Sequence, residues 1–365
     1  MTEQRIRTIQ ARLRRNHLDA ILVSQPENRR YLSGYSAPDH SISESSGHLL
    51  IPARQDPWLL TDFRFQQQAT AEAKACRVEL YPKGLLKLLG QLLPDLGIWR
   101  LAFESHYTLH ASALKLSELT DRLGINLQPL SGWVEALRLI KDEDEINRIR
   151  DAVALNEKVF QQIRQTLAPG LSEIEVALAI ENEMRLQGAE GPSFATIVAS
   201  GPNSALPHAV PSRAVITNED PLMIDMGLIL DGYCSDMTRT FSLGPASEKY
   251  LKIHRLVRTA QLAAMAEIRA GVPAATVDRA ARKIITHGGY GDSFGHALGH
   301  GVGLAVHEEP RLSARNRCHL RAGMVVTVEP GIYLPDWGGV RLENMVVIRE
   351  DGCELLNRDQ TGLDL

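Results

Sequence analysis

The clearest pattern in the chain is a pair of alternating apolar runs within residues 223–241 that flank the dipeptide Asp231-Gly232. Asp-Gly between two such runs is typical of a β-hairpin with a two-residue loop. With both residues in the loop, Leu230 faces Tyr233 across the two strands. The pattern therefore predicts an antiparallel hairpin with a defined register.

That register brings two aspartates together. Gly227 faces Asp236, and Asp225 lies two residues before Gly227, so both aspartates project from one face. Their Cα atoms are diagonal neighbours, about 7–8 Å apart. Carboxylates this close repel each other unless a positive charge lies between them, and hard divalent cations prefer oxygen ligands. The alternative is a surface hairpin on which two aspartates happen to align.

Downstream segments supply further groups of the same chemistry. Residues 293–311 are rich in glycine and histidine, and two later glutamates each interrupt an apolar, β-branched run. An ionised glutamate within such a run is costly unless it is paired or bound to a metal. Four carboxylates and one imidazole form the candidate ligand set: Asp225, Asp236, His300, Glu329 and Glu343. Two divalent cations would neutralise these carboxylates and leave room for a bridging water or hydroxide, as in a two-metal hydrolase.

Elsewhere the pattern of apolar positions predicts two domains. In residues 1–132, strand-like runs alternate with helical ones, which indicates an α/β domain with a mixed sheet. The boundary is expected near Gly132. Residues 133–365 then form a second α/β domain that contains the hairpin and the candidate ligands.

Helix patterns flank the hairpin of the second domain on both sides. Before the hairpin, Ser172 and Glu175 form a capping box at the start of one helix. After it, two helices are expected at residues 247–270 and about 274–287. The charge cluster Lys141–Glu145 is interpreted as the solvated start of a helix.

Composition excludes several classes of partner. The net charge is −4 with no basic block, which argues against a nucleic-acid-binding protein. No apolar run reaches about 18 residues, so no membrane span is expected. The four cysteines are scattered, and the first residues contain no apolar stretch typical of a secretory signal. These features favour a cytoplasmic protein with free thiols.

Four segments resemble the pita-bread metallopeptidases, family M24. They are the hairpin at 225–241, Gly-His-Gly-Val-Gly at 299–303, Val-Glu-Pro-Gly at 328–331 and Val-Arg-Leu-Glu-Asn at 340–344. Within that family they are most similar to the Xaa-Pro peptidases, prolidase and aminopeptidase P. The resemblance implies an α/β (α+β) fold, with a creatinase-like domain at 1–132 followed by a pita-bread catalytic domain.

The resemblance also implies roles for the ligands. Asp225 would chelate one metal ion, Asp236 and Glu343 would bridge two, and His300 with Glu329 would complete the other. A metal-bridging hydroxide would be the nucleophile, and Glu329 would relay a proton to the leaving nitrogen. The carboxylate-rich set favours Mn, with Co, Zn and Fe as alternatives.

Further polar residues match positions around the family's active site. The resemblance implies that His208 and His307 stabilise the oxyanion of the scissile carbonyl. His296 would line the pocket of the leaving residue, and Arg311 would hold a dipeptide's carboxylate. Arg341 is grouped with these substrate-site residues and is expected to orient the metal-binding carboxylates from the same strand face as Glu343.

The function implied is exopeptidase cleavage before proline in short peptides with proline second. Dipeptidase and aminopeptidase activities both stay open. The alternatives are a methionine-aminopeptidase-like or other M24 aminopeptidase, and a catalytically silent pita-bread protein that binds peptides or partners. Creatinase-like hydrolysis of a small amidino acid is disfavoured because all five ligand positions are filled. A homodimer is expected by analogy with the family.

Overall fold

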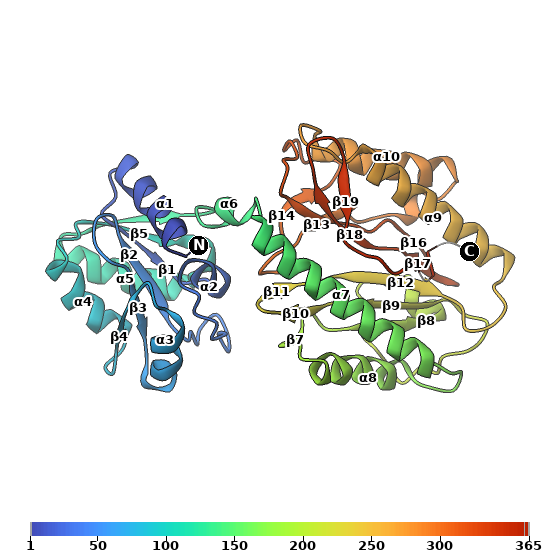
Figure 1. The fold of residues 1–365 in the computed structure, drawn as a ribbon, viewed down its shortest axis with the longest axis horizontal. Helices are drawn as coiled ribbons and strands as arrows, with labels where there is room; N and C mark the ends of the chain where they lie inside the picture. The colour runs from blue at the N-terminus through green and yellow to red at the C-terminus, as the bar shows by residue number, and fades with distance from the viewer. Residues whose placement is uncertain (1, 361, 364–365) are drawn as a thin grey trace. The chain divides into compact units, whose positions relative to one another are not determined.

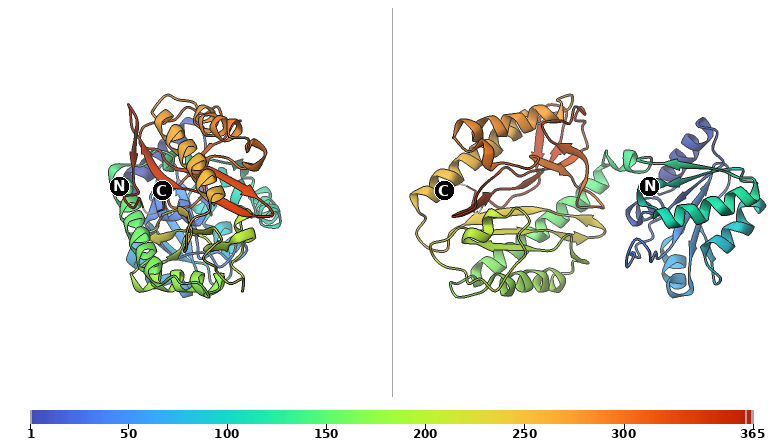
Figure 2. Two further views of the ribbon diagram at one scale, coloured as in Figure 1. Left: turned by 90° about the vertical axis from the view of Figure 1, so that its right-hand side faces the viewer. Right: turned by 180° about the vertical axis from the view of Figure 1, so that it is seen from behind.

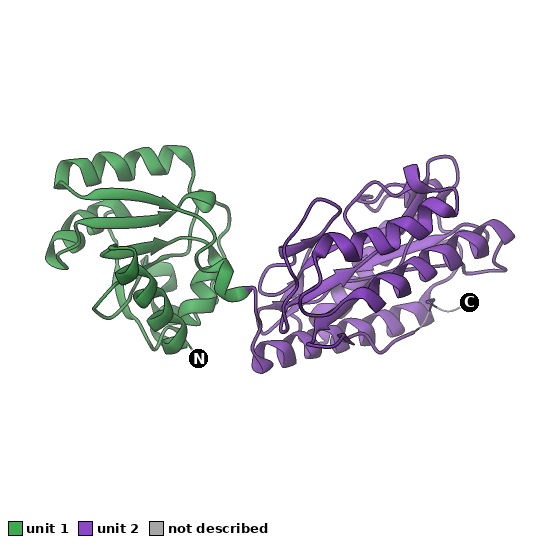
Figure 3. Cartoon of the chain, turned by 90° about the horizontal axis from the view of Figure 1, so that it is seen from above, with its two compact units in different colours: residues 1–138 green, residues 139–365 purple. Residues whose placement is uncertain are grey.

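The chain folds into two compact units, shown in different colours in Figure 3. The structure is a computed structural model that describes residues 2–360 and 362–363. Unit 1 spans Met1–Arg138 and unit 2 spans Leu139–Leu365. This division lies a little beyond Gly132, because the next residues keep contacts within unit 1. Arg12 donates to the carbonyl of Trp133 at 2.9 Å, and Arg138 donates to Asn28 Oδ1 at 2.8 Å.

Unit 1 is built on a mixed six-stranded sheet with the order β4-β3-β2-β1-β5-β6 (Figure 1). Its strands are β1 (Ala20–Val23), β2 (His48–Pro52), β3 (Trp58–Thr61), β4 (Arg77–Leu80), β5 (Arg100–Glu104) and β6 (Asn126–Leu130). Strand β2 is antiparallel to both of its neighbours, and all other pairs are parallel. The predicted α/β class with a mixed sheet is therefore confirmed.

Helices pack against this sheet and bury its apolar side chains. They are α1 (Thr2–Arg15), α2 (Pro26–Ser33), α3 (Gln66–Glu72), α4 (Leu85–Asp95), α5 (His110–Leu123) and α6 (Glu135–Arg138), with 3₁₀ turns η1 (Phe63–Phe65) and η2 (Ser105–Tyr107). Leucines of α4 and α5 form one cluster with Ala20, Leu22 and Leu50. Period-two alternation places these sheet residues on a common face. That alternation explains why two helices can cover them together.

The first half of unit 2 carries the predicted hairpin. Its helices are α7 (Glu143–Thr166) and α8 (Glu173–Leu186), and its strands are β7 (Gly191–Pro192), β8 (Ile197–Ser200), β9 (Leu222–Met226), β10 (Leu228–Leu230), β11 (Tyr233–Cys234) and β12 (Met237–Phe241), with η3 (Gly201–Ala205). The capping box at Ser172 and Glu175 is confirmed at the start of α8. Such a cap is typically worth about 1 kcal/mol.

The second half of unit 2 carries the candidate ligands that come later in the chain. It comprises α9 (Glu248–Glu267), α10 (Ala274–His287), η4 (Gly291–Ser293), β13 (Gly299–Gly301), β14 (Glu308–Leu312), β15 (Val325–Val328), β16 (Gly331–Leu334), β17 (Gly338–Arg341), β18 (Asn344–Ile348) and β19 (Cys353–Leu355). The two helices expected after the hairpin are thus present as α9 and α10. The principal sheet of this half has the order β14-β13-β15-β18-β19, and β16 pairs with β17.

The strands of unit 2 lie between two pairs of helices (Figures 1 and 2). Apolar residues of α7 and α8 pack with β8, β9 and β12, and those of α9 and α10 pack with β14 to β18. Each helix pair therefore has its own core, and the strand faces that point inward are free to carry polar groups. Among the described residues, no helix combines the length and apolar character that a membrane crossing requires.

The expected solvated helix start at Lys141–Glu145 is corrected by the structure. Lys141 and Glu145 are both buried, at 4% exposure each. Glu145 closes a capping box with Asp142 at the start of α7 and accepts a hydrogen bond from Tyr233 at 2.8 Å. Lys141 forms an ion pair with Glu308. Two charged residues of this cluster are therefore buried because they have partners that are distant in sequence.

Candidate metal centre

The hairpin has the predicted turn and register. Asp231 and Gly232 have φ angles of 48° and 85°, and positive φ at both loop positions defines a type I′ turn. Leu230 pairs with Tyr233, as predicted. The same register continues into the pairing of β9 with β12. The Asp-Gly signal therefore identified the turn correctly.

The two strands change sheets between the tip of the hairpin and its base. Strands β10 and β11 belong to one sheet, and β9 and β12 belong to another. Gly227 lies at this junction, where an added Cβ would be 2.1 Å from the carbonyl oxygen of Ser235. Only glycine fits so close an approach. Asp225 ends up in β9 beside the junction, and Asp236 ends up just before β12, and both are buried.

A second pair of strands repeats this arrangement with two glutamates. Val328 of β15 pairs with Asn344 of β18, and Gly331 of β16 pairs with Arg341 of β17. Both pairs follow a single register, which puts Glu329 opposite Glu343 at the break between them. The glutamates that interrupt the two apolar runs therefore face each other where the strands pass from one sheet to another.

Ligand-type atoms from both halves of unit 2 converge at these breaks. Asp236, His300 and Glu343 each offer one ligand atom, and the three atoms lie within 4.8 Å of one another. His300 Nε2 lies 3.5 Å from Asp236 Oδ2 and 3.3 Å from Glu329 Oε1. Asp225 Oδ1 and Glu343 Oε1 are buried without a hydrogen-bond partner in the described part of the chain. Buried carboxylate oxygens without partners fit a cation-binding cluster.

The electrostatics of the cluster favour a cation. Burial, reinforced by neighbouring carboxylates, raises the pKa of Asp236 and of Glu343 well above their usual range. Burial also raises the pKa of Glu329 to about 7, although the charge of Arg341 opposes the shift. The pKa of His300 is lowered by burial to about 4. Without cations, protons would neutralise the carboxylates of the cluster. Divalent cations would instead stabilise ionised carboxylates and a neutral imidazole.

Arg341 lies beside this cluster and is buried. Its Nη2 donates to Asp225 Oδ2 at 2.6 Å, and its Nε donates to Thr238 Oγ1 at 3.1 Å. The Thr238 hydroxyl in turn donates to Glu343 Oε2 at 2.7 Å. Arg341 and Thr238 thereby link two candidate ligands that come from different halves of unit 2. This geometry fits the expected role of orienting carboxylates, and it occupies the Arg341 guanidinium with protein partners.

Two threonines were missed by sequence reasoning. Thr238 bonds Glu343, and Thr327 Oγ1 donates to Glu329 Oε1 at 3.0 Å and accepts from His300 N at 3.0 Å. Period-two alternation could have indicated both, because Thr238 lies two residues after Asp236 and Thr327 lies two residues before Glu329. Each hydroxyl orients a carboxylate through a hydrogen bond.

The predicted substrate-site histidines gather near the cluster. His307 packs edge-on against His300, with ring centroids 4.3 Å apart. His208 lies in the loop after η3, close enough for its charge to lower the pKa values of His296 and His307. His208 and His307 are exposed. Both rings are therefore accessible to a substrate.

His296 lies in a more enclosed position. Its Nε2 is 2.9 Å from the Tyr333 hydroxyl, and its Nδ1 is 2.7 Å from the carbonyl oxygen of Ala297. Burial lowers the pKa of His296 to about 4. A neutral ring with its proton on Nδ1 satisfies all of these contacts, with the Tyr333 hydroxyl donating to Nε2. Since Arg341 donates to the Tyr333 hydroxyl at 3.0 Å, His296 is tied to the cluster through Tyr333.

Arg311 lies on β14 with an exposed side chain. Its charge contributes to the lowered pKa values of His300 and His307, so it lies near both rings. Within residues 2–360 and 362–363, its guanidinium has no ion-pair partner. Arg311 can therefore meet an anionic group from a ligand.

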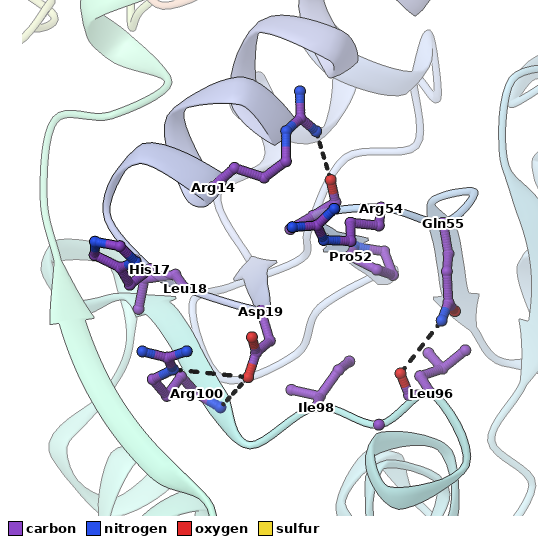
Figure 4. A pocket seen from close by; sticks show the side chains of 12 residues that line it. Arg14, His17, Leu18, Asp19, Pro52, Arg54, Gln55, Leu96, Ile98 and Arg100 are labelled. Atoms are coloured by element: carbon purple, nitrogen blue, oxygen red, sulfur yellow. Dashed lines mark hydrogen bonds and ion pairs between the residues drawn. The ribbon is translucent and has the colours of Figure 1, made fainter.

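A separate pocket of about 200 Å³ lies in unit 1 (Figure 4). Its lining includes Arg14, His17, Asp19, Arg54 and Arg100. Two of these residues are already engaged, since Arg14 donates to a backbone carbonyl at 2.6 Å and Asp19 accepts from two backbone amides. None of the predicted site residues lines this pocket. The chemistry argued from the sequence thus belongs to unit 2.

Comparison with known proteins follows the two units. Residues 147–350 match the model of metallopeptidase family M24, and residues 5–140 match that of the creatinase/prolidase N-terminal domain. The chain is 35% identical over 351 residues to an Xaa-Pro dipeptidase of Pyrococcus horikoshii. That match covers 96% of this chain and 95% of that protein.

Solved structures show the same relationship. An Xaa-Pro dipeptidase from Bacillus anthracis superposes with a TM-score of 0.91 and 36% identity, covering 98% of each chain. An X-Pro aminopeptidase from Thermotoga maritima superposes with a TM-score of 0.86 and 36% identity, covering 95% of this chain and 98% of that one. The expected creatinase-like and pita-bread folds are thus confirmed. This chain belongs to metallopeptidase family M24 and is a hydrolase with a creatinase/prolidase-type N-terminal domain.

Proposed function

We propose that this protein is a dinuclear metallo-exopeptidase that hydrolyses the peptide bond before proline in short peptides. The observation that carries the proposal is the buried cluster of Asp236, His300 and Glu343, flanked by Glu329 and Asp225. Four carboxylates around one imidazole form a donor set for two divalent cations, and two of their buried oxygens have no partner among the residues that the structure describes. Relatives named Xaa-Pro dipeptidase and X-Pro aminopeptidase support the choice of substrate.

In this proposal the five residues divide between two cations as the family resemblance implies. Asp225 would hold one cation, His300 and Glu329 would hold the other, and Asp236 and Glu343 would be shared between them. Carboxylate-rich ligation favours Mn, and Co, Zn and Fe are the alternatives. When bound, the cations acidify a water molecule and polarise the scissile carbonyl.

The protein's own side chains complete the proposed chemistry. His208 and His307, which are exposed beside the cluster, donate hydrogen bonds to the carbonyl oxygen as negative charge develops on it. Glu329 accepts a proton and passes it to the leaving nitrogen. Arg341, held by Asp225 and Thr238, keeps the carboxylates in place during these transfers.

The choice between dipeptidase and aminopeptidase depends on what meets the substrate's C-terminal side. Arg311 is exposed, has no ion-pair partner in the described part of the chain and lies near His307. A guanidinium in that position can bind the carboxylate of a dipeptide in a bidentate fashion. We therefore propose dipeptidase activity first and aminopeptidase activity second.

A comparison of matched peptides tests this proposal. An Xaa-Pro dipeptide, the corresponding Xaa-Pro-Xaa tripeptide and the N-acetylated dipeptide are incubated with the metal-loaded enzyme. We expect rapid cleavage of the dipeptide and near inertness of the acetylated form, because an exopeptidase that releases the N-terminal residue engages its free amine. A matching Xaa-Ala dipeptide is the control for proline selectivity. Efficient cleavage of acetylated or internal Xaa-Pro bonds would overturn the exopeptidase assignment.

The same experiment addresses the competing functions. Preferential cleavage of methionyl peptides without proline would indicate a methionine-aminopeptidase-like enzyme. A silent peptide-binding protein would bind peptides without turnover even after metal loading. The complete set of ligand-type residues disfavours the silent alternative. A protein that binds no metal would have to bury these carboxylates without cations to balance their charge.

Two further properties belong to the proposal. All four cysteines are free thiols, which supports a cytoplasmic location with a reducing environment. A homodimer is proposed by analogy with the family, and sedimentation analysis of the purified protein checks it.

A further inference from the structure

Lys141 and Glu308 form a buried ion pair within unit 2. Lys141 Nζ lies 3.1 Å from Glu308 Oε2, and the two side chains are 1% and 8% exposed. The pair joins residues that are 167 positions apart in the chain. A buried ion pair adds little net stability, because desolvation of both charges offsets their attraction. We therefore looked for a role of this pair other than stabilising the fold.

The Glu308 carboxylate organises the loop that precedes it. Its Oε1 accepts a hydrogen bond from the amide of Ala305 at 3.0 Å, and Gly303 N donates to the carbonyl of Ala305 at 3.0 Å. A Cβ on Gly303 would lie 2.7 Å from Glu308 Oε2. The carboxylate thus lies against the backbone of residues 303–305 and holds the loop closed.

Lys141 fixes the other side of that carboxylate. Its backbone amide donates to the carbonyl of Gly323 at 2.9 Å, just before β15. Both the backbone and the side chain of Lys141 are therefore anchored. The ammonium gives the Glu308 carboxylate a defined position instead of the several that a free glutamate side chain would sample.

His307 directly precedes Glu308 and depends on this loop. Its ring packs edge-on against His300, but no described residue forms a hydrogen bond with it. An aromatic contact of this kind contributes only about 0.5–1.5 kcal/mol. The position of the ring must therefore be set mainly by the backbone of the loop that Glu308 closes.

We propose that Lys141 and Glu308 are a positioning pair that holds His307 in place for the reaction. The inference rests on the proposed role of His307 and deepens it, because it assigns a function to two residues outside the metal cluster. Neither residue contacts substrate in this proposal. They act through the loop at 303–307, and their loss should affect turnover more than substrate binding or metal content.

A double-mutant cycle tests the coupling. The conservative Glu308→Gln variant is prepared in the wild-type and His307→Ala backgrounds, and kcat, KM and bound metal are measured for all four proteins. In the wild-type background we expect kcat to fall roughly ten- to a hundredfold, since a misplacement of about 1 Å can cost that much. KM and metal content should stay within about twofold. In the His307→Ala background, Glu308→Gln should cause no further loss of kcat.

Additional variants separate positioning from stability. Lys141→Met with Glu308→Gln removes both charges, so the double variant should fold at least as stably as either single variant. Its kcat should remain low, because neutral side chains do not restore the ionic contact. Glu354→Gln is a control for loss of an ionic carboxylate elsewhere in unit 2, because Glu354 forms partly exposed ion pairs with Arg150 at 2.6 Å and Arg349 at 2.5 Å. We expect its kcat to be unchanged.

The outcomes distinguish this inference from the proposed function. If His307→Ala alone leaves kcat unchanged, the proposed role of His307 is wrong. If His307→Ala lowers kcat and Glu308→Gln multiplies that loss, the pair does not act through His307 and the positioning inference is overturned. An equal loss of kcat in Glu354→Gln, or recovery of kcat in the doubly neutral variant, would overturn it as well.

Discussion

Unit 1 and unit 2 each bury charged side chains, but they neutralise them differently. In unit 1, Arg29 and Asp39 form an ion pair at 2.7 Å with side chains 0% and 4% exposed. Both terminal nitrogens of Arg29 also have hydroxyl or carbonyl partners, among them Ser24 O and Ser46 Oγ. In the candidate metal cluster of unit 2, the three buried carboxylates of Asp225, Asp236 and Glu343 outnumber the guanidinium of Arg341 that bonds Asp225. The oxygens Asp225 Oδ1 and Glu343 Oε1 have no hydrogen-bond partner among the described residues.

This difference distinguishes a structural charge from a functional one. A buried pair of opposite charges neutralises itself and needs no ion from outside the protein. A cluster of like charges is stable only when protons or cations enter it, and its raised pKa values record that need. Burial alone is shared by both units, so the balance of charge is the property that identifies the site.

The largest effect is expected from Asp236→Ala. If Asp236 is shared by both cations as proposed, its loss should lower the metal content and abolish hydrolysis. Elemental analysis and a dipeptide assay measure the two effects. The folded protein should persist without metal, because the substitution also removes a like charge from the cluster. Full turnover by a metal-loaded variant would contradict the two-metal proposal.

Asp39→Ala should show the opposite behaviour. It leaves Arg29 buried without its carboxylate, which typically costs about 3–5 kcal/mol of stability. Urea unfolding should therefore detect a loss of stability, while the folded variant keeps its metal ions. Asp39→Asn, which retains an acceptor for the guanidinium, should lose less. If Asp39→Ala lost its metal ions and kept normal stability, the distinction between the buried charges of the two units would be wrong.

His208→Ala and His307→Ala distinguish substrate-site histidines from metal ligands within unit 2. We expect each variant to retain its metal ions and to lose roughly a hundred- to a thousandfold in kcat, or about 2.7–4 kcal/mol, as for other lost oxyanion donors. Steady-state kinetics with parallel metal analysis checks this. Loss of metal in either variant would show that the histidine is a ligand instead.

The smallest effect concerns pH and the metal-free protein. The pKa of Glu329 is raised from 4.5 to about 7, so the folded state binds more protons than the unfolded state between these values. Stability should therefore decrease as pH rises through this range. His300 titrates in the opposite sense, because its pKa is lowered to about 4.

Subtraction isolates the contribution of Glu329. The unfolding free energies of wild-type and Glu329→Gln proteins are measured in chelator from pH 4.5 to 7, and we expect the wild type to lose more stability as pH rises. Added divalent metal should reverse the trend, because it favours the ionised carboxylate. Equal pH profiles for the two metal-free proteins would mean that folding does not raise the pKa of Glu329.

The sequence predicted the parts of the site that depend on local pattern. Asp231-Gly232 determined the turn, and period-two alternation then placed Asp225 and Asp236 on one face. Interrupted apolar runs identified Glu329 and Glu343 as costly residues within strands. These signals are short-range, and a hairpin register follows from them with few assumptions.

Other features depend on contacts that a local pattern does not encode. Lys141 was expected in solvent but is buried, because its partner Glu308 lies far along the chain. Helix α2 was not predicted, because its eight residues are too few for a clear apolar period, although Pro26 and Gly34 mark its two ends. The tie between His296 and Tyr333 likewise requires the folded strands.

The contact between Thr238 and Glu343 has a consequence for how the protein acquires activity after synthesis. This hydrogen bond spans 105 residues, and the ion pair of Arg341 with Asp225 spans 116. Contacts of such separation close late during folding, because the intervening chain must first be ordered. A nascent chain of which only the hairpin has emerged from the ribosome therefore lacks a complete metal cluster. Cations would bind after unit 2 has folded and would not nucleate its folding.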